Sequence, residues 1–317
     1  MTTLSVQNSP VISGTIRLRS TRRRDAWERC VRTSLVTCGG LTMLTTAAII
    51  IVLARETWKF FESPEVSIVE FLTGTTWSPL LGAEKHFGIW PLVCGTLLVT
   101  GVAMLFALPC GLITAIYLSE YAPRSLRAVL KPVLEILAGI PTVVYGFFAL
   151  VVFTPALQKL HSGFEVYNAF SAGIAVGIMC LPIVCSLAED ALQAVPRSLR
   201  EGAHAVGATK FDVSLKVVVP AAMSGIVASF LLAIARAVGE TMIVALAAGG
   251  LAHMTADPRQ PTQTMTAYMV QIFLGDASNF GPEYLSSYAV AAALFLMTFI
   301  ITVIGYRVRV RFREAYE

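Results

Sequence analysis

The chain has 317 residues, of which 56% are hydrophobic and only 14% are charged, and its mean hydropathy is +0.70. This composition excludes an ordinary soluble domain and predicts a polytopic membrane protein. The formal net charge of +4 does not indicate a nucleic-acid partner, because the basic residues lie between apolar runs, where they mark membrane topology. The six cysteines show no metal-ligand spacing and are expected to be inert.

Several apolar runs are long enough to cross a bilayer as helices. The predicted fold class is therefore an all-α membrane protein with six transmembrane helices, surrounded by membrane lipid. Because the number of spans is even, both termini are expected on the same side of the membrane. The predicted spans are residues 33–53, 89–118, 133–153, 168–187, 221–248 and 284–306.

The remaining segments divide the chain into tails, loops and a core. Residues 1–32 form a basic tail, residues 54–88 a long loop with interface tryptophans, residues 89–306 the core with the other five spans, and residues 307–317 a second basic tail. The loop is expected to contain an amphipathic piece at residues 66–72.

The distribution of lysine and arginine predicts the orientation. Eighteen of the 24 basic residues lie in the two tails and in the loops 119–132 and 196–220, whereas five lie on the opposite side. Since basic residues concentrate on the cytoplasmic side, both termini and these loops are expected in the cytoplasm. The expected location is the plasma (inner) membrane of a bacterium.

The polar interval 196–220 separates the fourth and fifth predicted spans. Pro196 suits the first position of a helix, Gly207 suits a left-handed position after a helix, and Thr209 with Asp212 is typical of a capping box. These residues predict two short helices with a bend at Gly207. From them alone, the interval is either a docking surface or a structured loop without a partner.

The same interval resembles the EAA loop of bacterial ABC importer permeases, whose pattern is E-A-A-x3-G-x9-I-x-L-P. Gly202 departs from the second position of that pattern, and Val217 and Val219 replace its two aliphatic residues. In that family the loop forms coupling helices that dock on a separate ATPase subunit. The resemblance implies this coupling role for Glu201, Gly202, Ala203, Gly207 and Pro220.

The chain is not expected to bind ATP or to be an enzyme. Gly202 and Gly207 have the spacing of Walker A glycines, but Ala208-Thr209-Lys210 follows instead of lysine and serine or threonine. No nucleophile with its base and no metalloprotease motif is present. No cofactor is therefore expected in this chain, and ATP and Mg²⁺ would be bound by the partner ATPase.

Two charged residues lie near the middle of the predicted fifth span. Arg236 and Glu240 have i, i+4 spacing, which predicts that both lie on one helix face within pairing distance. A charge at this depth costs about 2.5–3.5 kcal/mol on insertion scales, so such residues usually face a bundle interior or an aqueous path. Two interpretations remain open: a structural ion pair, and an anion site in which the guanidinium fork binds a tetrahedral oxyanion.

The predicted third span is interrupted by Gly139-Ile140-Pro141. Such a break frees backbone groups and is tolerated where it lines a cavity or packs on protein. Thr142 and Tyr145, just after the break, are candidate hydrogen-bond donors to an anion, or they pack beside a simple proline kink. Glu135, just before it, is expected either inside the membrane or at its interface.

Three segments resemble the PstC family of phosphate-uptake permeases, and the sibling family PstA shares the general pattern: IYLSEYAP (116–123), AGIPTVVYGFFALVVFTP (138–155) and ARAVGETMIV (235–244). The resemblance covers about residues 87–307 and implies the type I, MetI-like, ABC importer permease fold. It implies inorganic phosphate as substrate, with Arg236 and Glu240 in its path. The implied partners are PstA, two copies of the ATPase PstB and the external phosphate-binding protein PstS.

Two alternatives remain beside phosphate transport. One is a type I permease for another oxyanion, such as molybdate or sulfate. The other is a membrane scaffold or sensor without transport, whose polar interval binds a regulator.

Overall fold

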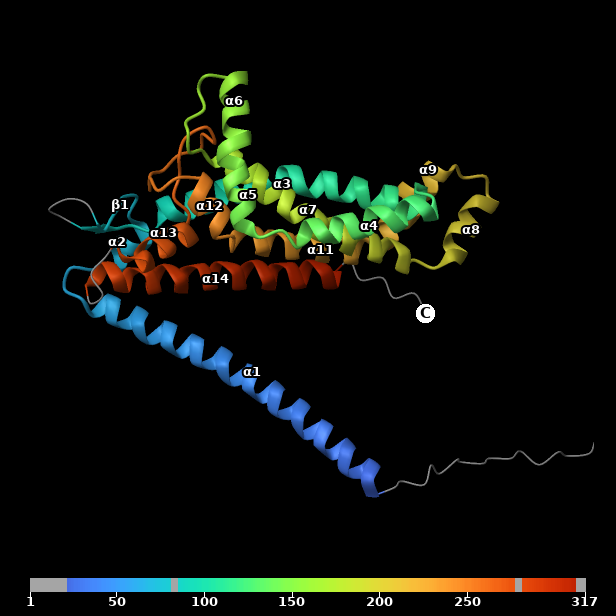
Figure 1. The fold of residues 1–317 in the computed structure, drawn as a ribbon, viewed down its shortest axis with the longest axis horizontal. Helices are drawn as coiled ribbons and strands as arrows, with labels where there is room; N and C mark the ends of the chain where they lie inside the picture. The colour runs from blue at the N-terminus through green and yellow to red at the C-terminus, as the bar shows by residue number, and fades with distance from the viewer. Residues whose placement is uncertain (1–21, 81–84, 277–280, 312–317) are drawn as a thin grey trace, which may run out of the picture. The chain divides into compact units, whose positions relative to one another are not determined.

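The computed structural model describes residues 22–80, 85–276 and 281–311, and these are mostly helical (Figure 1). The chain divides into two units, residues 1–52 and residues 53–317. The first unit is described only through the N-terminal part of α1 (Arg22–Glu62), and residues 1–21 of the predicted basic tail lie outside the described residues. Because α1 continues to Glu62, its last nine residues are helical where the loop 54–88 was predicted.

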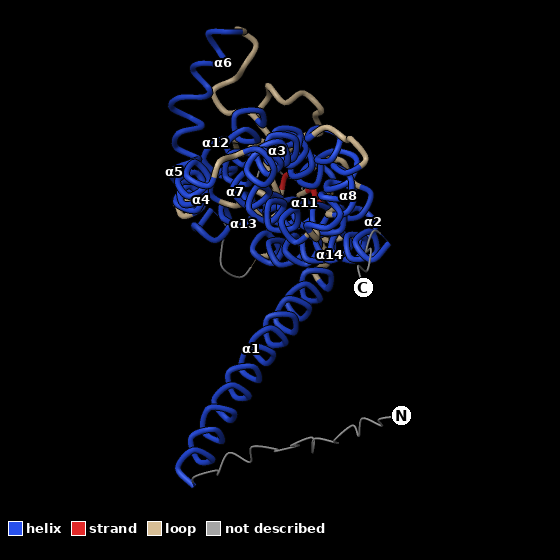
Figure 2. The backbone as a smooth tube through the Cα atoms, turned by 90° about the vertical axis from the view of Figure 1, so that its right-hand side faces the viewer, coloured by secondary structure: helices blue, strands red, loops and turns tan. Residues whose placement is uncertain are grey.

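Four long helices of the second unit pack side by side: α3 (Trp90–Ile116), α7 (Ala169–Ala194), α11 (Met223–Val238) and α14 (Pro282–Arg311). Figure 2 looks along their axes and shows them as one cluster. Glycines bring α3 and α7 close, since a Cβ at Gly173 or Gly177 would overlap Val102 or Ala103. This small-xxx-small spacing, Gly173-x3-Gly177, is typical of closely packed membrane helices.

The segment between α7 and α11 forms short helices at one end of the bundle: α8 (Arg197–Ala205), α9 (Lys210–Asp212), the π-helical turn η3 (Val213–Val218) and α10 (Val219–Ala221). Two helical pieces with a bend at Gly207 were predicted, and Gly207 has a φ of 86°. The Thr209 hydroxyl accepts the Asp212 N–H at 3.2 Å, as a helix cap does. Pro196 is the N-cap of α8 and not its first helical residue.

The opposite end carries smaller elements: α2 (Ile68–Thr73), β1 (Trp77–Ser78), β2 (His86–Phe87), α13 (Met265–Gln271) and the π-helical turn η4 (Ile272–Asp276). The strands pair antiparallel with Trp77 opposite Phe87. The Trp77 ring lies edge-on to Tyr268 of α13, with ring centroids 4.9 Å apart. The amphipathic piece predicted at residues 66–72 is α2, whereas the predicted loop 249–283 contains α13, a helix that the sequence analysis did not foresee.

The third span begins later than predicted. Residues 133–138 belong to α4 (Arg124–Ala138), an amphipathic helix that also includes much of the predicted basic loop 119–132. Pro141 is extended, with φ −57° and ψ 136°, and it lacks an N–H, so the helix ends before it. The apolar helix then runs through three pieces: α5 (Thr142–Phe148), η2 (Ala149–Phe153) and α6 (Thr154–Leu160).

The fifth span is broken, which the sequence analysis did not predict. α11 ends at Val238, and α12 (Met242–Ala247) begins only after residues 239–241. Within the described residues, five helices are long and apolar enough to cross a membrane, or six when Lys210–Ala221 and Met223–Val238, which meet at a bend of 70°, count as one span. α14 matches the predicted sixth span and extends it to Arg311.

A pair of glycine substitutions tests the packing of α3 on α7. Gly173→Ala adds a methyl group that overlaps Val102, and we expect it to lower the unfolding free energy by about 1–3 kcal/mol, as overpacking does. Gly101→Ala on α3 adds the same methyl group where no atom lies within 4 Å, so this control is expected to be neutral or slightly stabilising. Unfolding midpoints of the two variants in detergent give the comparison, and equal midpoints would contradict the close approach.

Candidate transport path and coupling surface

Glu240 lies in the break between α11 and α12 and caps the second of these helices. Its side chain is 7% exposed, and Oε1 accepts the N–H groups of Met242 at 3.1 Å and Ile243 at 3.2 Å. A carboxylate at this position accepts N–H groups that have no partner within α12, and it faces the positive end of the α12 dipole. The hydroxyl of Thr266 in α13 donates to the Glu240 carbonyl at 2.6 Å, which fixes the break from the other side.

Arg236, in the last turn of α11, has no hydrogen bond or ion pair to any described residue, and its side chain is exposed. The predicted i, i+4 pair with Glu240 is wrong, because helical geometry stops at Val238 and the Glu240 carboxylate turns to the N-terminus of α12. The guanidinium therefore keeps its donors available, in a segment where a charge is costly to bury.

The break before α5 lies beside α12. Gly146 of α5 packs against Ile243 and Leu246 of α12, where a Cβ would be crowded. The Tyr145 hydroxyl donates to the Leu137 carbonyl at 2.7 Å and so bridges the break before α5. Thr142 is half-buried, and its hydroxyl makes no hydrogen bond to the described chain. Of the two candidate donors, Thr142 is free and Tyr145 is already engaged.

Glu135 lies on α4 and is exposed, outside the helices that are long and apolar enough to cross a membrane. It lines a cavity of about 330 Å³ between α4, α7 and α11, together with Lys131, Glu189 and mostly apolar residues. The interfacial location of Glu135 stays a prediction.

The residues that resemble the EAA loop lie on the surface of the α8–α10 segment. Glu201, Gly202, Gly207 and Pro220 are exposed, whereas Ala203 is half-buried against the bundle. Three apolar side chains of the same segment are also exposed: Val206, Phe211 and Leu215. Exposed apolar side chains beside a conformationally fixed bend are typical of a docking surface.

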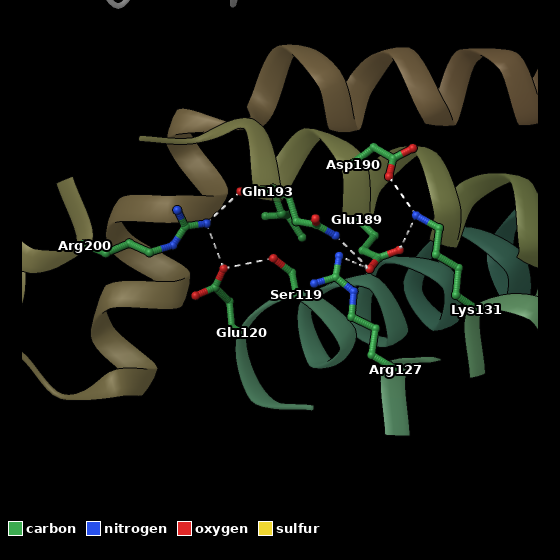
Figure 3. Close-up of polar contacts among 9 residues, drawn as sticks. Ser119, Glu120, Arg127, Lys131, Glu189, Asp190, Gln193 and Arg200 are labelled. Carbon is green, nitrogen blue, oxygen red and sulfur yellow. Dashed lines mark hydrogen bonds and ion pairs between the residues drawn. The ribbon is translucent and has the colours of Figure 1, made fainter. Parts of the chain in front are cut away.

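Two carboxylates near α8, one half-buried and one buried, were missed by the sequence analysis (Figure 3). Glu120, in the π-helical turn η1 (Tyr117–Tyr121) after α3, pairs with Arg200 of α8 at 3.0 Å. Glu189 of α7 is 1% exposed and pairs with two residues of α4, Arg127 at 2.6 Å and Lys131 at 3.3 Å. Each acid lies far along the chain from its bases, so no local spacing indicates the pairs.

Lys131 also bonds Asp190 of α7 at 3.0 Å. This hydrogen bond raises the pKa of the Lys131 ammonium, and the Coulomb attraction of Glu189 adds to the effect, while burial opposes it. The charge of Lys131 is therefore present at neutral pH, where α4 meets α7.

Residues 107–314, about two thirds of the chain, match the protein family described as binding-protein-dependent transport system inner membrane component. The chain belongs to this family of ABC transporter permeases. A permease subunit of this family is a multi-pass membrane protein and is not itself catalytic, as the sequence analysis predicted. The described helices agree with that assignment.

Curated relatives of this permease include transporters with named substrates. The probable ABC transporter permease protein YqgH of Bacillus subtilis is 32% identical over 296 residues, which is 93% of this chain and 95% of that protein. The phosphate transport system permease protein PstC of Mesorhizobium japonicum is 33% identical over 74% of this chain and 76% of its own length. The predicted resemblance to PstC permeases is confirmed.

Solved structures confirm the predicted type I, MetI-like, fold. A bacterial ABC transporter involved in the import of the polysaccharide alginate aligns over 92% of this chain and 100% of the solved chain, with a TM-score of 0.62 and 14% identity. The MetNI methionine ABC transporter in an inward-facing conformation covers 72% of this chain and 95% of its own, with a TM-score of 0.53 and 19% identity. At these identities the likeness concerns the fold alone.

The helix-cap role of Glu240 gives a prediction that an Arg236–Glu240 pair would not. Glu240→Ala removes the acceptor of two N–H groups and is expected to lower the unfolding free energy by about 0.5–2 kcal/mol, whereas Glu240→Gln retains an acceptor oxygen and is expected to cost less. Arg236→Gln is expected to leave the unfolding midpoint in detergent nearly unchanged, because it leaves no carboxylate without a partner. A loss in Arg236→Gln as large as that in Glu240→Ala would restore the ion-pair interpretation.

Proposed function

We propose that this permease is the PstC-type transmembrane subunit of an ATP-driven importer of inorganic phosphate. The observation that carries the proposal is the guanidinium of Arg236, which has no acidic partner among the described residues and lies at the end of α11, next to a break in the span. Several PstC relatives at 30–33% identity support phosphate as the anion. Glu240 and Thr142 belong to the same path in this proposal.

The chemistry of Arg236 suits a tetrahedral oxyanion. A guanidinium offers a planar fork of donors that matches two oxygens of one phosphate, and it stays charged at every physiological pH. Glu240 is the nearest acidic residue along the chain, and its carboxylate accepts N–H groups of α12 and forms no ion pair with Arg236. The free hydroxyl of Thr142 is a candidate second donor, whereas Tyr145 would first have to release the Leu137 carbonyl.

The α8–α10 segment is the proposed docking surface for the ATPase PstB, present in two copies, which would bind ATP and Mg²⁺. Its exposed Val206, Phe211 and Leu215 supply an apolar contact, and Glu201 supplies a charge beside it. A PstA protein of Mycobacterium tuberculosis is 38% identical over 51% of this chain, which supports PstA as the sibling permease. The external phosphate-binding protein PstS would deliver phosphate at the opposite end, near α2 and α13.

The substrate assignment is tested by uptake of radiolabelled phosphate, normalised to assembled complex. Arg236→Gln removes a charge-assisted contact worth about 1.5–3 kcal/mol, so uptake is expected to fall by about tenfold or more. Arg236→Lys retains the charge without the fork and is expected to be intermediate. Glu240→Gln leaves Arg236 in place and retains an acceptor oxygen for α12, so its uptake is expected to fall less than that of Arg236→Gln.

Wild-type uptake by a well-assembled Arg236→Gln variant would remove Arg236 from the phosphate path. Competition with sulfate and molybdate on the wild-type complex separates the oxyanions, because a molybdate or sulfate permease would lose phosphate uptake at low concentrations of its own substrate. A complex that transports none of the three anions would favour the scaffold or sensor alternative.

The proposed orientation is tested with single-cysteine probes in a variant without the native cysteines. Ser198 lies in α8 and Ser162 follows α6, and both serines are exposed. The predicted topology places them on opposite sides of the membrane. We expect a membrane-impermeant maleimide to label Ser162→Cys in intact cells and Ser198→Cys only after the membrane is opened. Labelling of Ser198→Cys in intact cells would contradict the cytoplasmic location of α8 and of both termini.

A further inference from the structure

The side chain of Arg200 joins α8 to three other points of the permease. Nη1 donates to the Val195 carbonyl at 2.6 Å, and Nη2 donates to the Leu192 carbonyl at 2.7 Å and to Glu120 Oε1 at 3.0 Å. The two carbonyls end α7, where backbone acceptors have no partner within the helix. One planar guanidinium therefore holds the start of α8, the end of α7 and the turn after α3 together.

The Glu120 oxygen that binds Arg200 also accepts a hydrogen bond from the preceding residue. The Ser119 hydroxyl donates to Glu120 Oε1 at 3.0 Å, and the Glu120 side chain is 10% exposed. Only Ala122 and Pro123 separate η1, which contains Glu120, from α4. A displacement of α8 that pulls on Glu120 therefore acts directly on the start of α4.

Glu189 supplies the second link, between α7 and α4. Arg127 and Lys131 lie one turn apart on α4, and both contact this carboxylate, which also accepts an N–H from Gln193 at 2.8 Å. A buried carboxylate left without a cation is strongly destabilising, so α4 must keep Glu189 paired. Because the two cations are one turn apart, α4 can shift along α7 while one of them remains paired with Glu189.

The remaining contacts of α4 are weak. None of its residues is buried, and its apolar contacts to the bundle come from half-buried leucines, such as Leu130 and Leu134. The outer face exposes Val129, Val133 and Ile136. After α4 the chain enters the break 139–141, and Tyr145 ties the start of α5 back to Leu137 in the last turn of α4. The position of α4 thus sets the position of the break.

We propose that Arg200 and Glu189 are positioning residues that carry the movement of α8 to α4 and, through it, to the break before α5. Arg200 moves Glu120 and the start of α4, and Glu189 guides α4 along α7 between Arg127 and Lys131. The inference rests on the proposed function, because the ATPase that docks on α8 supplies the movement.

The test uses the complete complex in proteoliposomes and measures phosphate transported per ATP hydrolysed. Arg200→Lys keeps the charge but cannot reach Glu120 and both carbonyls at once, and Glu189→Gln removes the charge that guides α4. Both variants are expected to lower the ratio of phosphate transported to ATP hydrolysed by at least about fivefold, which lies within the range of coupling changes that single substitutions cause. Basal ATP hydrolysis and co-purification of the ATPase are expected to persist.

Asp190→Asn is the matched control for Glu189→Gln. Asp190 is the next residue of α7 and also bonds Lys131, but its side chain is 58% exposed, so its removal is expected to leave the ratio near that of the wild type. The double variant Arg127→Gln, Glu189→Gln removes one charge of each sign. It controls for misfolding, because neither charge is left without its partner. It is expected to assemble normally and to remain uncoupled, whereas a merely structural role predicts wild-type transport.

Wild-type ratios in assembled Arg200→Lys and in the assembled double variant would overturn the inference. A wild-type complex without phosphate uptake would instead contradict the proposed function, so the two failures are distinguishable.

Discussion

The structure depends on one constraint, which is that backbone polar groups at membrane depth need partners inside the protein because no water reaches them. Two spans of this permease are broken, and both breaks meet the requirement with side chains. Tyr145 donates to the Leu137 carbonyl across the first break, and Glu240 accepts N–H groups of α12 at the second, while Thr266 donates to the Glu240 carbonyl. Side-chain hydrogen bonds thus replace part of the backbone pairing that a continuous helix would supply.

The same constraint separates the roles of two charged residues that look like a pair in the sequence. Glu240 is an acceptor for the second broken span, and Arg236 is left with its donors free. On the proposed function, the phosphate path needs a cation without an acidic partner, and Arg236 has none among the described residues. The α8 end has the opposite arrangement, since Glu120 and Glu189 are each matched by bases from another helix.

The apolar runs were sufficient to predict the spans that are regular helices. The run at residues 284–306 lies inside α14, and the run at 89–118 coincides closely with α3 and η1. The break at 239–241 contains no proline, and its one local signal is Gly239, the C-cap of α11, because a glycine inside an apolar run can also continue a helix. Thr266, whose hydroxyl donates to the Glu240 carbonyl, lies 26 residues further along the chain. The pair Glu120–Arg200 spans 80 residues, and only the packing of η1 on α8 brings it together.

The free guanidinium of Arg236 has an electrical consequence on the proposed function. An anion that enters a cell moves against a membrane potential that is negative inside, at a cost of about 2.3 kcal/mol per charge and 100 mV. A fixed positive charge along the way does not change the total work, which ATP hydrolysis must supply. It lowers the highest point of the profile, because a monovalent phosphate on Arg236 crosses that depth as a neutral pair. For a divalent phosphate beside Arg236, one negative charge would remain at that depth.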